Sequence, residues 1–400
     1  MKQLKKIASK LHLILGLTSG IIVFIVSITG ALYVFEQEWR DLTQAKYLYV
    51  DRQVAEETPL SRVTSIVTEN YPKAKITNIR LQKIDNEDKA AAIIVQTKDK
   101  KAISLNPYSG EIIGVRNMKT DMMSVAVDIH THLLLGDVGE QIIKWNVLIF
   151  FFMVITGLVL WLPPNWKMLK WVLTLKKAKT PVQLNYDLHR ILGFYASFIL
   201  LIIATTGIWW VFESVQHTIY SATNSPKTLL EKVKQPKAPP QYFTEKQPIF
   251  TVQNAFDAVN NNPEYTGWHQ AFVQPPKDSA TPMSVLLRYP YSWVRKQNRI
   301  SFDQFTGQVL RADLYKNYST GDKIRVSNYD WHTGRIGGIF TKILFFFAAL
   351  FSASLPITGF LIWFNKWKMG RKRQNNMSFS SISKTKNPKS ILVQFLRLRL

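Results

Sequence analysis

Four of the seven histidines in the chain recur in pairs within short repeated segments. His12 and His189 each stand in a Leu-His-x-x-Leu-Gly segment, and His130 and His332 each stand in an Asp-x-His-Thr segment. Two histidines on neighbouring helices at one depth can ligate a haem iron above and below the porphyrin plane. The pattern therefore predicts two b-type haems, one ligated by each pair, and with them one-electron transfer.

The segments around these histidines belong to an internal repeat. A Thr-Gly pair follows each of the first two histidines by 17 and 18 residues, and another follows each of the second two by 26 and 27 residues. Such a repeat indicates two copies of one unit that pack together, with the functional site at their interface. We expect the glycines to allow close helix packing or to make room for a flat macrocycle. The pairs are Thr29-Gly30, Thr206-Gly207, Thr156-Gly157 and Thr358-Gly359.

The elements that must position these motifs are four apolar blocks. Each has roughly 20 residues or more, the length at which a helix crosses about 30 Å of hydrocarbon. We therefore predict an integral membrane α-helical protein with four transmembrane helices arranged as two repeats. In each repeat a helix pair brackets a small α+β domain outside the cytoplasm. The apolar blocks are residues 11–35, 142–162, 191–212 and 339–364.

Charge sets the expected orientation in the bilayer. The chain has a formal net charge of +24, and residues 1–10, 163–190 and 365–400 carry +4, +5 and +10 of it. These segments alternate with the large loops, which is the positive-inside pattern. Both termini are therefore expected in the cytoplasm, and no nucleic-acid partner is needed to explain the charge. The chain has no cysteine, which excludes disulfides, iron–sulfur clusters and covalently attached haem.

The loops extend the repeat. Helices are predicted at 60–70 and 252–260, and a strand, a turn and a second strand at 104–113 and 301–310. The expected organisation is a first transmembrane helix at 1–36, a first outer domain at 37–128, a second helix at 129–163, a cytoplasmic connection at 164–187, a third helix at 188–213, a second outer domain at 214–329, a fourth helix at 330–366 and a basic cytoplasmic tail at 367–400.

A single histidine at a membrane boundary is more often an amphipathic anchor than a ligand. Four in mirrored positions favour ligation, because polar groups near lipid are costly. His132 stays open as an alternative outer ligand, and His217 and His269 have no assigned role. Basic residues beside the ligand candidates fit haem propionates and membrane-edge anchors equally well. They are Lys10, Arg190 and Arg335.

With these motifs the chain resembles the PepSY-associated transmembrane proteins, an iron-regulated family that includes ferric-siderophore reductases of the bacterial inner membrane. The resemblance extends to about residue 370 and includes PepSY-like strand-turn-strand loops in the two outer domains. It implies a haem-containing, multi-pass inner-membrane reductase with periplasmic loops. Such a protein takes electrons across the membrane and reduces siderophore-bound Fe(III) to Fe(II), which oxygen chelators hold far less well.

The second outer domain holds the expected substrate surface, because aromatic and cationic side chains suit a flat anionic chelate. An amphipathic strand with a solvated basic face explains the same residues equally well. The cluster comprises Arg288, Tyr289, Tyr291, Trp293, Arg295, Lys296 and Arg299.

The inner connection is too short for a nucleotide-binding domain. The electron donor is therefore expected to be separate, either membrane quinol or a cytoplasmic reductase. Two functions of other classes compete with the reductase. One is a haem-free membrane anchor whose PepSY-like domains bind a periplasmic partner such as a peptidase. The other is a chelate transporter, which the lack of interior charges in the helices disfavours.

Overall fold

The structure is a computed structural model that describes residues 2–163, 165–175, 180–237 and 250–383. The described chain divides into two compact units. A helical unit contains the described parts of 1–27, 149–201 and 348–400, and a sheet unit contains 28–148 and 202–347. Each unit is described by itself below.

Four helices are long and apolar enough to cross a membrane among the described residues. They cover the four predicted apolar blocks to within one residue, so this part of the prediction is confirmed. The apolar blocks of these helices have almost no charged residues in their interiors, as the bilayer requires. The helices are α1 (Lys2–Val34), α6 (Gly136–Trp161), α8 (Pro181–Val211) and α12 (Gly338–Ser383).

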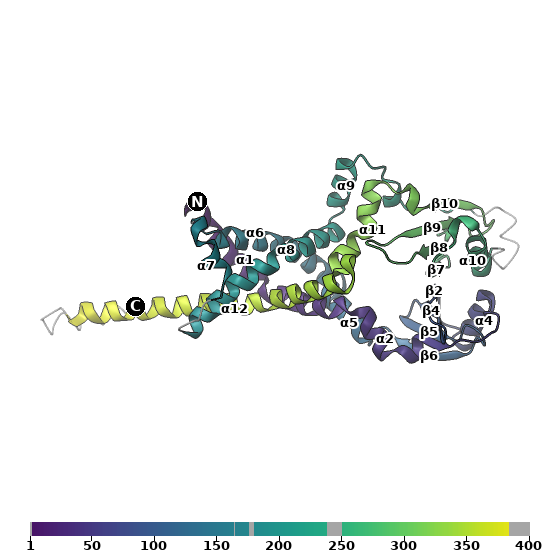
Figure 1. Cartoon of the computed structure of the whole chain (residues 1–400), viewed down its shortest axis with the longest axis horizontal. Helices are drawn as coiled ribbons and strands as arrows, with labels where there is room; N and C mark the ends of the chain where they lie inside the picture. The colour runs from purple at the N-terminus through teal and green to yellow at the C-terminus, as the bar shows by residue number, and fades with distance from the viewer. Residues whose placement is uncertain (1, 164, 176–179, 238–249, 384–400) are drawn as a thin grey trace. The chain divides into compact units, whose positions relative to one another are not determined.

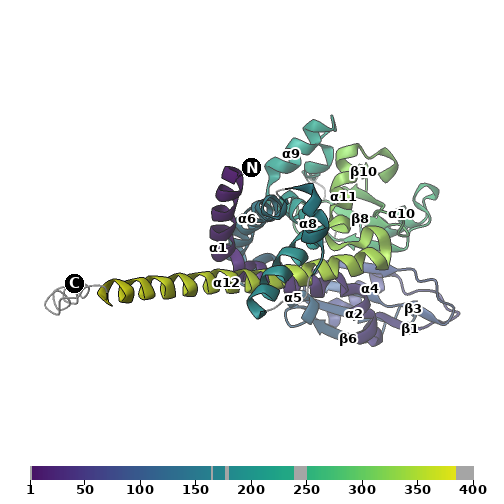
Figure 2. The same ribbon diagram turned by 60° about the vertical axis from the view of Figure 1, so that its left-hand side comes forward.

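Within the helical unit these four helices contact one another around a ring (Figure 2). Trp161 of α6 stacks on Phe194 of α8 with 3.6 Å between ring centroids. Ser27 of α1 donates a hydrogen bond to Ser352 of α12 at 2.9 Å. The contacts between α1 and α6 and between α8 and α12 include hydrogen bonds of His12 and His189.

The sheet unit is built on one antiparallel sheet of eight strands, in the order β10-β9-β8-β7-β2-β4-β5-β6 (Figure 1). The first loop supplies β2, β4, β5 and β6, and the second supplies β7 to β10. The two halves join where β2 pairs with β7. The strands are β2 (Ile76–Gln82), β4 (Ile93–Thr97), β5 (Lys101–Leu105), β6 (Ile112–Asn117), β7 (Gln270–Gln274), β8 (Met283–Arg288), β9 (Gln297–Phe302) and β10 (Val309–Asp313).

The loops thus share one sheet and one core, whereas the sequence predicts a small domain within each helix pair. Helices α4 (Leu60–Asn70) and α10 (Val252–Asn260) have the predicted bounds. Both pack on the same face of the sheet, where a single hydrophobic core includes residues of both loops. Because β2 and β7 lie next to each other, the core runs across the junction without a polar break.

Shorter elements lie between the long helices and the strands of the large sheet, and two of them, η1 and α7, lie between α6 and α8. Helix α5 lies between β6 and α6, and helix α11 lies between β10 and α12. In Figure 1 α5 and α11 lie on the side of the strands away from α4 and α10. The shorter elements are α2 (Glu36–Thr43), α3 (Ala45–Leu48), β1 (Tyr49–Asp51), β3 (Lys89–Ala91), α5 (Met122–His132), η1 (Trp166–Met168), α7 (Leu169–Leu173), α9 (Glu213–Ala222), η2 (Thr228–Leu230), η4 (Pro263–Tyr265), η5 (Tyr315–Asn317), α11 (Thr320–Thr333) and η6 (Arg335–Gly337).

The second and fourth predicted helices, 129–163 and 330–366, are each broken near their start. Helix α5 ends at His132, and the next two residues, Leu133 and Leu134, have φ of 52° and 59°. Helix α11 ends before Gly334, whose φ is 72°. A left-handed residue stops a right-handed helix, and glycine adopts this conformation without strain. His130 and His332 therefore lie on separate helices that precede the spanning ones, and not at the ends of the spanning helices.

The fourth helix also continues beyond its predicted end at residue 366. Helix α12 reaches Ser383, since the residues that follow Trp367 include good helix formers and no proline. The remainder of the predicted tail, 384–400, lies outside the described residues.

Candidate functional site

The first histidine pair lies in the helical unit. His12 of α1 and His189 of α8 have ring centroids 6.3 Å apart, with an angle of 84° between the ring planes. The structure thus brings together two residues that are 177 positions apart in the sequence. Their role as ligands stays a prediction, but their proximity follows from the packing of the four helices.

His12 is fixed by the Thr-Gly pair of the neighbouring helix α6. Its Nδ1 lies 3.1 Å from the carbonyl oxygen of Met153 and 3.1 Å from Oγ1 of Thr156. A Cβ placed on Gly157 would lie 3.2 Å from Cε1 of His12. The threonine therefore anchors the imidazole, and the glycine leaves the space that the ring edge occupies.

His189 is fixed in the same way by α12. Its Nδ1 lies 2.8 Å from Oγ1 of Thr358 and is also hydrogen-bonded to the backbone of Leu355. A Cβ placed on Gly359 would lie 3.2 Å from its Cε1. The two halves of the repeat thus anchor their inner histidines with equivalent contacts.

The second histidine pair lies in the sheet unit. The rings of His130 on α5 and His332 on α11 have centroids 6.2 Å apart. Nδ1 of His332 lies 2.8 Å from Oγ1 of Thr206, and Nδ1 of His130 lies 3.3 Å from Oγ1 of Thr29. The glycines that follow these threonines, Gly30 and Gly207, face the imidazole edges. Each of the four histidines therefore contacts a Thr-Gly pair on the other helix of its own repeat.

These contacts determine which ring nitrogen carries the proton. The hydroxyl of Thr358 donates to the backbone carbonyl of Ser354 at 3.0 Å, so its oxygen is left to accept from the histidine. A backbone carbonyl such as that of Met153 can only accept. Nδ1 is therefore the protonated nitrogen, and Nε2 keeps the lone pair with which imidazole binds metals.

The residues present fit a haem better than a bare metal ion. A structural zinc site needs four protein ligands, whereas haem iron takes two at most from the protein. An imidazole nitrogen lies about 2.0–2.1 Å from its metal and the ring centroid about 1.1 Å further out, so two opposed imidazoles have centroids about 6.3 Å apart. The measured 6.3 Å and 6.2 Å agree with this spacing.

The model of one protein family, described as the PepSY-associated TM region, matches residues 9–366. The chain belongs to this family. The match contains all four spanning helices up to residue 366 and all four paired histidines. No curated protein matches the chain.

In this PepSY-associated membrane protein the other histidines lie apart from the two pairs. Nδ1 of His132 is 3.3 Å from Oδ1 of Asp128 and 2.7 Å from Oγ1 of Thr131. His217 is exposed on α9, and His269 lies just before β7. Of the two candidates for the outer ligand, it is thus His130, and not His132, that faces His332.

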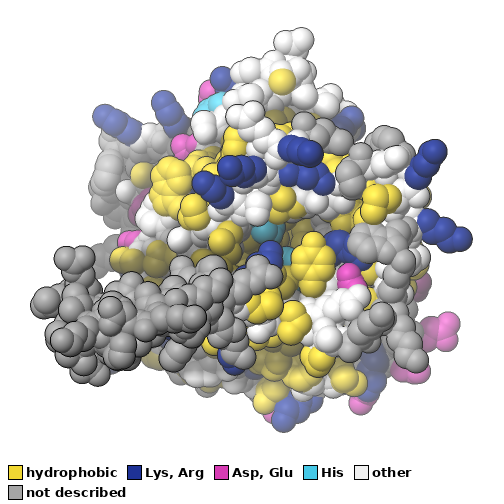
Figure 3. All heavy atoms as spheres, turned by 90° about the vertical axis from the view of Figure 1, so that its left-hand side faces the viewer, with side chains coloured by type: hydrophobic (Ala, Val, Ile, Leu, Met, Phe, Trp, Pro, Cys, Tyr) yellow, Lys and Arg dark blue, Asp and Glu magenta, His cyan; other side chains and the backbone are white. Residues whose placement is uncertain are grey.

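The basic residues beside the pairs have protein partners. Arg190 forms an ion pair with Asp187 at 3.1 Å, and Arg335 forms one with Glu36 at 3.5 Å. Lys10 is exposed on α1. On the face shown in Figure 3, Lys and Arg side chains are scattered among hydrophobic ones, and histidine is visible near the centre of the view. Arg335, next to the outer pair, keeps its Nε without a hydrogen-bond partner among the described residues.

The residues of the predicted substrate cluster lie on β8, on β9 and in the loop between these strands. Tyr291 and Trp293 are 44% and 78% exposed in the loop after β8. Arg295, in the same loop, forms an ion pair with the buried Asp330 at 3.5 Å. Arg288 and Arg299 lie within the sheet on β8 and β9. Burial, together with the nearby charge of Arg295, lowers the pKa of Arg288 to about 10.

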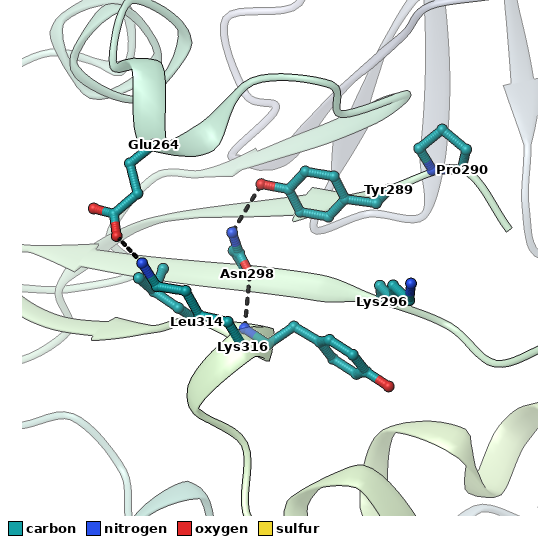
Figure 4. Close-up of a pocket in the computed structure, with 8 residues that line it drawn as sticks. Glu264, Tyr289, Pro290, Lys296, Asn298, Leu314 and Lys316 are labelled. Carbon is teal, nitrogen blue, oxygen red and sulfur yellow. Dashed lines mark hydrogen bonds and ion pairs between the residues drawn. The ribbon is translucent and has the colours of Figure 1, made fainter. Parts of the chain in front are cut away.

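A pocket of about 390 Å³ lies beside this cluster on the second half of the sheet. Its polar groups are largely paired with one another, as Figure 4 shows. Glu264 and Lys316 form an ion pair at 2.6 Å, and Asn298 donates to the hydroxyl of Tyr289 at 2.8 Å. None of the charged residues named for the substrate surface lines it except Lys296. The pocket therefore offers few free groups to a chelate.

The sequence shows the four Thr-Gly pairs but not their role. Their presence in every spanning helix predicts close helix packing or room for a flat macrocycle, and the partner of each pair depends on which helices are neighbours. A threonine that hydrogen-bonds a histidine looks the same in sequence as one that bonds only its own helix.

Replacing Thr358 by valine keeps the shape of the side chain and removes one of the two hydrogen-bond partners of His189. Loss of such an orienting partner typically lowers metal affinity about 10–100-fold. We expect weaker haem retention at the inner pair, measured by haem loss to an excess of a haem-binding acceptor protein. Thr358→Ser should retain the haem as the parent does. Equal retention in the valine variant would contradict the anchoring role.

Proposed function

We propose that this protein binds two b-type haems and carries electrons across the bacterial inner membrane to reduce ferric siderophores in the periplasm. The observation that carries the proposal is the pair of matched imidazole sites, with centroid separations of 6.3 Å and 6.2 Å and the same Thr-Gly support. An anchor without a cofactor has no physical reason to repeat this arrangement four times.

The order of the chain supports a path from the inner to the outer face. His12 follows the basic first ten residues, and His189 follows the basic connection between α6 and α8. Basic segments remain on the cytoplasmic side, so this pair belongs to the inner face. His130 and His332 adjoin the two large loops, which are then periplasmic. Both termini lie in the cytoplasm in this arrangement.

The residues of the chain contribute positions and proton states to this activity. A haem held by each pair supplies a one-electron couple. Thr358 and its equivalents hold the imidazoles in the tautomer that leaves Nε2 free to ligate. At the outer face one electron converts chelated Fe(III) to Fe(II), for which hard oxygen ligands have far lower affinity, so the metal is released. The electron comes from a separate donor, either membrane quinol or a cytoplasmic reductase.

An absorption spectrum of the purified protein tests the proposal. We expect a low-spin b-type Soret band with a sharp α band on reduction, at about two haems per chain. Adding a ferric siderophore to the reduced protein should restore the oxidised spectrum and yield Fe(II), measured with a ferrous chelator. A colourless protein from haem-replete cells would overturn the haem assignment and leave the membrane-anchor function.

A further inference from the structure

The eight-stranded sheet has a second face, opposite its hydrophobic core, that carries arginines from both halves of the sheet. Side chains alternate between the two faces of a strand. Ile79 and Leu81 of β2 belong to the core, so Arg80 points to the other face. The same alternation places Arg288 of β8 there, next to the core residue Leu287. We name Arg80, Arg116, Arg288 and Arg299 the arginine face.

The strand register places Arg80 beside Phe272, and Arg288 lies over the same ring. Arg80 pairs with Phe272, Phe272 pairs with Leu286, and Leu286 pairs with Arg299, which forms one row across four strands. The guanidinium of Arg288, in the next row, lies 4.6 Å from the centroid of the Phe272 ring. Strands β2 and β8 are two positions apart, about 9.5 Å, a distance that two long arginine side chains can span together.

The guanidinium groups of this face are incompletely paired. The Nε atoms of Arg80, Arg116 and Arg288 are buried and have no hydrogen-bond partner among the described residues. A buried unpaired donor costs about 1–3 kcal/mol, and native proteins seldom leave one without a reason. Burial also lowers the pKa of each arginine of the face, because it disfavours the charged form. A bound anion would offset both costs.

The nearest carboxylates are already used by other arginines. Arg40 forms ion pairs with Glu36 at 2.5 Å and with Asp121 at 2.9 Å. Arg295 forms an ion pair with Asp330 at 3.5 Å. Within the described residues, no carboxylate forms an ion pair within 4 Å with any member of the arginine face. Carboxylates such as Asp41, Asp121 and Asp330 act on these arginines only from beyond ion-pair distance.

We propose that the arginine face binds a small molecule with several carboxylate groups. A guanidinium presents parallel N–H donors that match the two oxygens of a carboxylate, and several guanidiniums together select a multiply charged anion over a singly charged one. The ring of Phe272 supplies an apolar floor between them.

Aromatic contacts join this region to the outer histidine pair. The ring of Trp210 lies 4.8 Å from that of His332 and 6.5 Å from that of Tyr329. Arg295 lies over the same Tyr329 ring at 4.7 Å. This step rests on the proposed function. The ligand is then a ferric chelate that contains carboxylates, and the arginine face holds it near the outer histidine pair. Carboxylate binding itself does not depend on haem.

Citrate is a suitable probe, measured by isothermal titration calorimetry on the full chain in nanodiscs at low salt. We expect the parent to bind citrate at one site per chain. Arg80→Gln and Arg288→Gln should each bind citrate at least tenfold more weakly than the parent. High salt should weaken the binding by both variants further. The uncharged trimethyl ester of citrate should not bind. Arg62→Gln is the matched control, because Arg62 is exposed on α4, on the opposite face of the sheet. It should bind citrate as the parent does.

Arg288→Lys keeps the positive charge and removes the parallel N–H donors of the guanidinium. Its affinity for citrate should therefore lie between those of the parent and Arg288→Gln. Such an intermediate affinity excludes misfolding as the cause of the loss. The carboxylates could belong to a soluble ligand or to the propionates of a haem. The haem content of each variant separates these two sources. Unchanged haem with lost citrate binding supports a soluble ligand. The proposal is overturned if the parent does not bind citrate. It is overturned likewise if the arginine variants lose haem and the parent does not bind citrate. Citrate binding by a haem-free protein would leave this inference intact and refute only the proposed function.

Discussion

Replacing His332 by alanine should reduce the haem content from about two per chain to about one and abolish reduction of ferric siderophore. His332 faces His130 with 6.2 Å between ring centroids, and its Nδ1 is held by Thr206. His130→Ala should have the same effect. On the proposed function, the haem expected to remain is the inner one, at the two histidines of the helical unit. Pyridine haemochrome assay and a ferrous-chelator assay measure both quantities.

His132→Ala is the control for this prediction. His132 is two residues from His130 and is partnered by Asp128 and Thr131, so its loss should leave about two haems and the parental rate. If His132→Ala removed a haem and His130→Ala did not, the outer ligand would be misassigned. If no substitution among the four paired histidines lowered the haem content, neither pair would be a haem site.

Replacing Gly359 by valine should remove the inner haem although both inner histidines are still present. A Cβ at this position lies 3.2 Å from Cε1 of His189, and the γ carbons of valine extend beyond it. The imidazole must then rotate or move away from α12, which breaks its alignment with His12. Overpacking of this kind also costs about 1–3 kcal/mol of stability. Haem content and the reduced-minus-oxidised spectrum measure the loss.

Gly370→Val is the matched control, because it lies on the same helix and a Cβ there meets nothing within 4 Å. It should retain about two haems. Gly157→Val should reproduce the effect of Gly359→Val, since a Cβ on Gly157 lies at the same 3.2 Å from Cε1 of His12. Full haem content in both glycine variants would show that the Thr-Gly pairs pack helices and do not position ligands.

The contact between His189 and the Thr358-Gly359 pair shows where prediction from the sequence stopped. The repeat shows both motifs, and hydropathy shows the helices that carry them. Sequence spacing relates each histidine to a Thr-Gly pair on its own or the following helix, but it does not say which pair it contacts. That contact depends on the rotation and depth of each helix against its neighbours, which are set by packing over the whole bundle.

The sequence alone determined the four apolar helices, the basic segments, the helices at 60–70 and 252–260 and the paired histidines, because these depend on residue type and local periodicity. Only the tertiary structure decided that β2 and β7 pair across the two loops, since those strands are almost 190 residues apart. It also decided that α5 and α11 end before the spanning helices begin, through left-handed residues at 133 and 334. The arginine face follows from that same strand pairing. The pairing of β2 with β7 is a contact between distant segments, which local patterns in a chain do not encode.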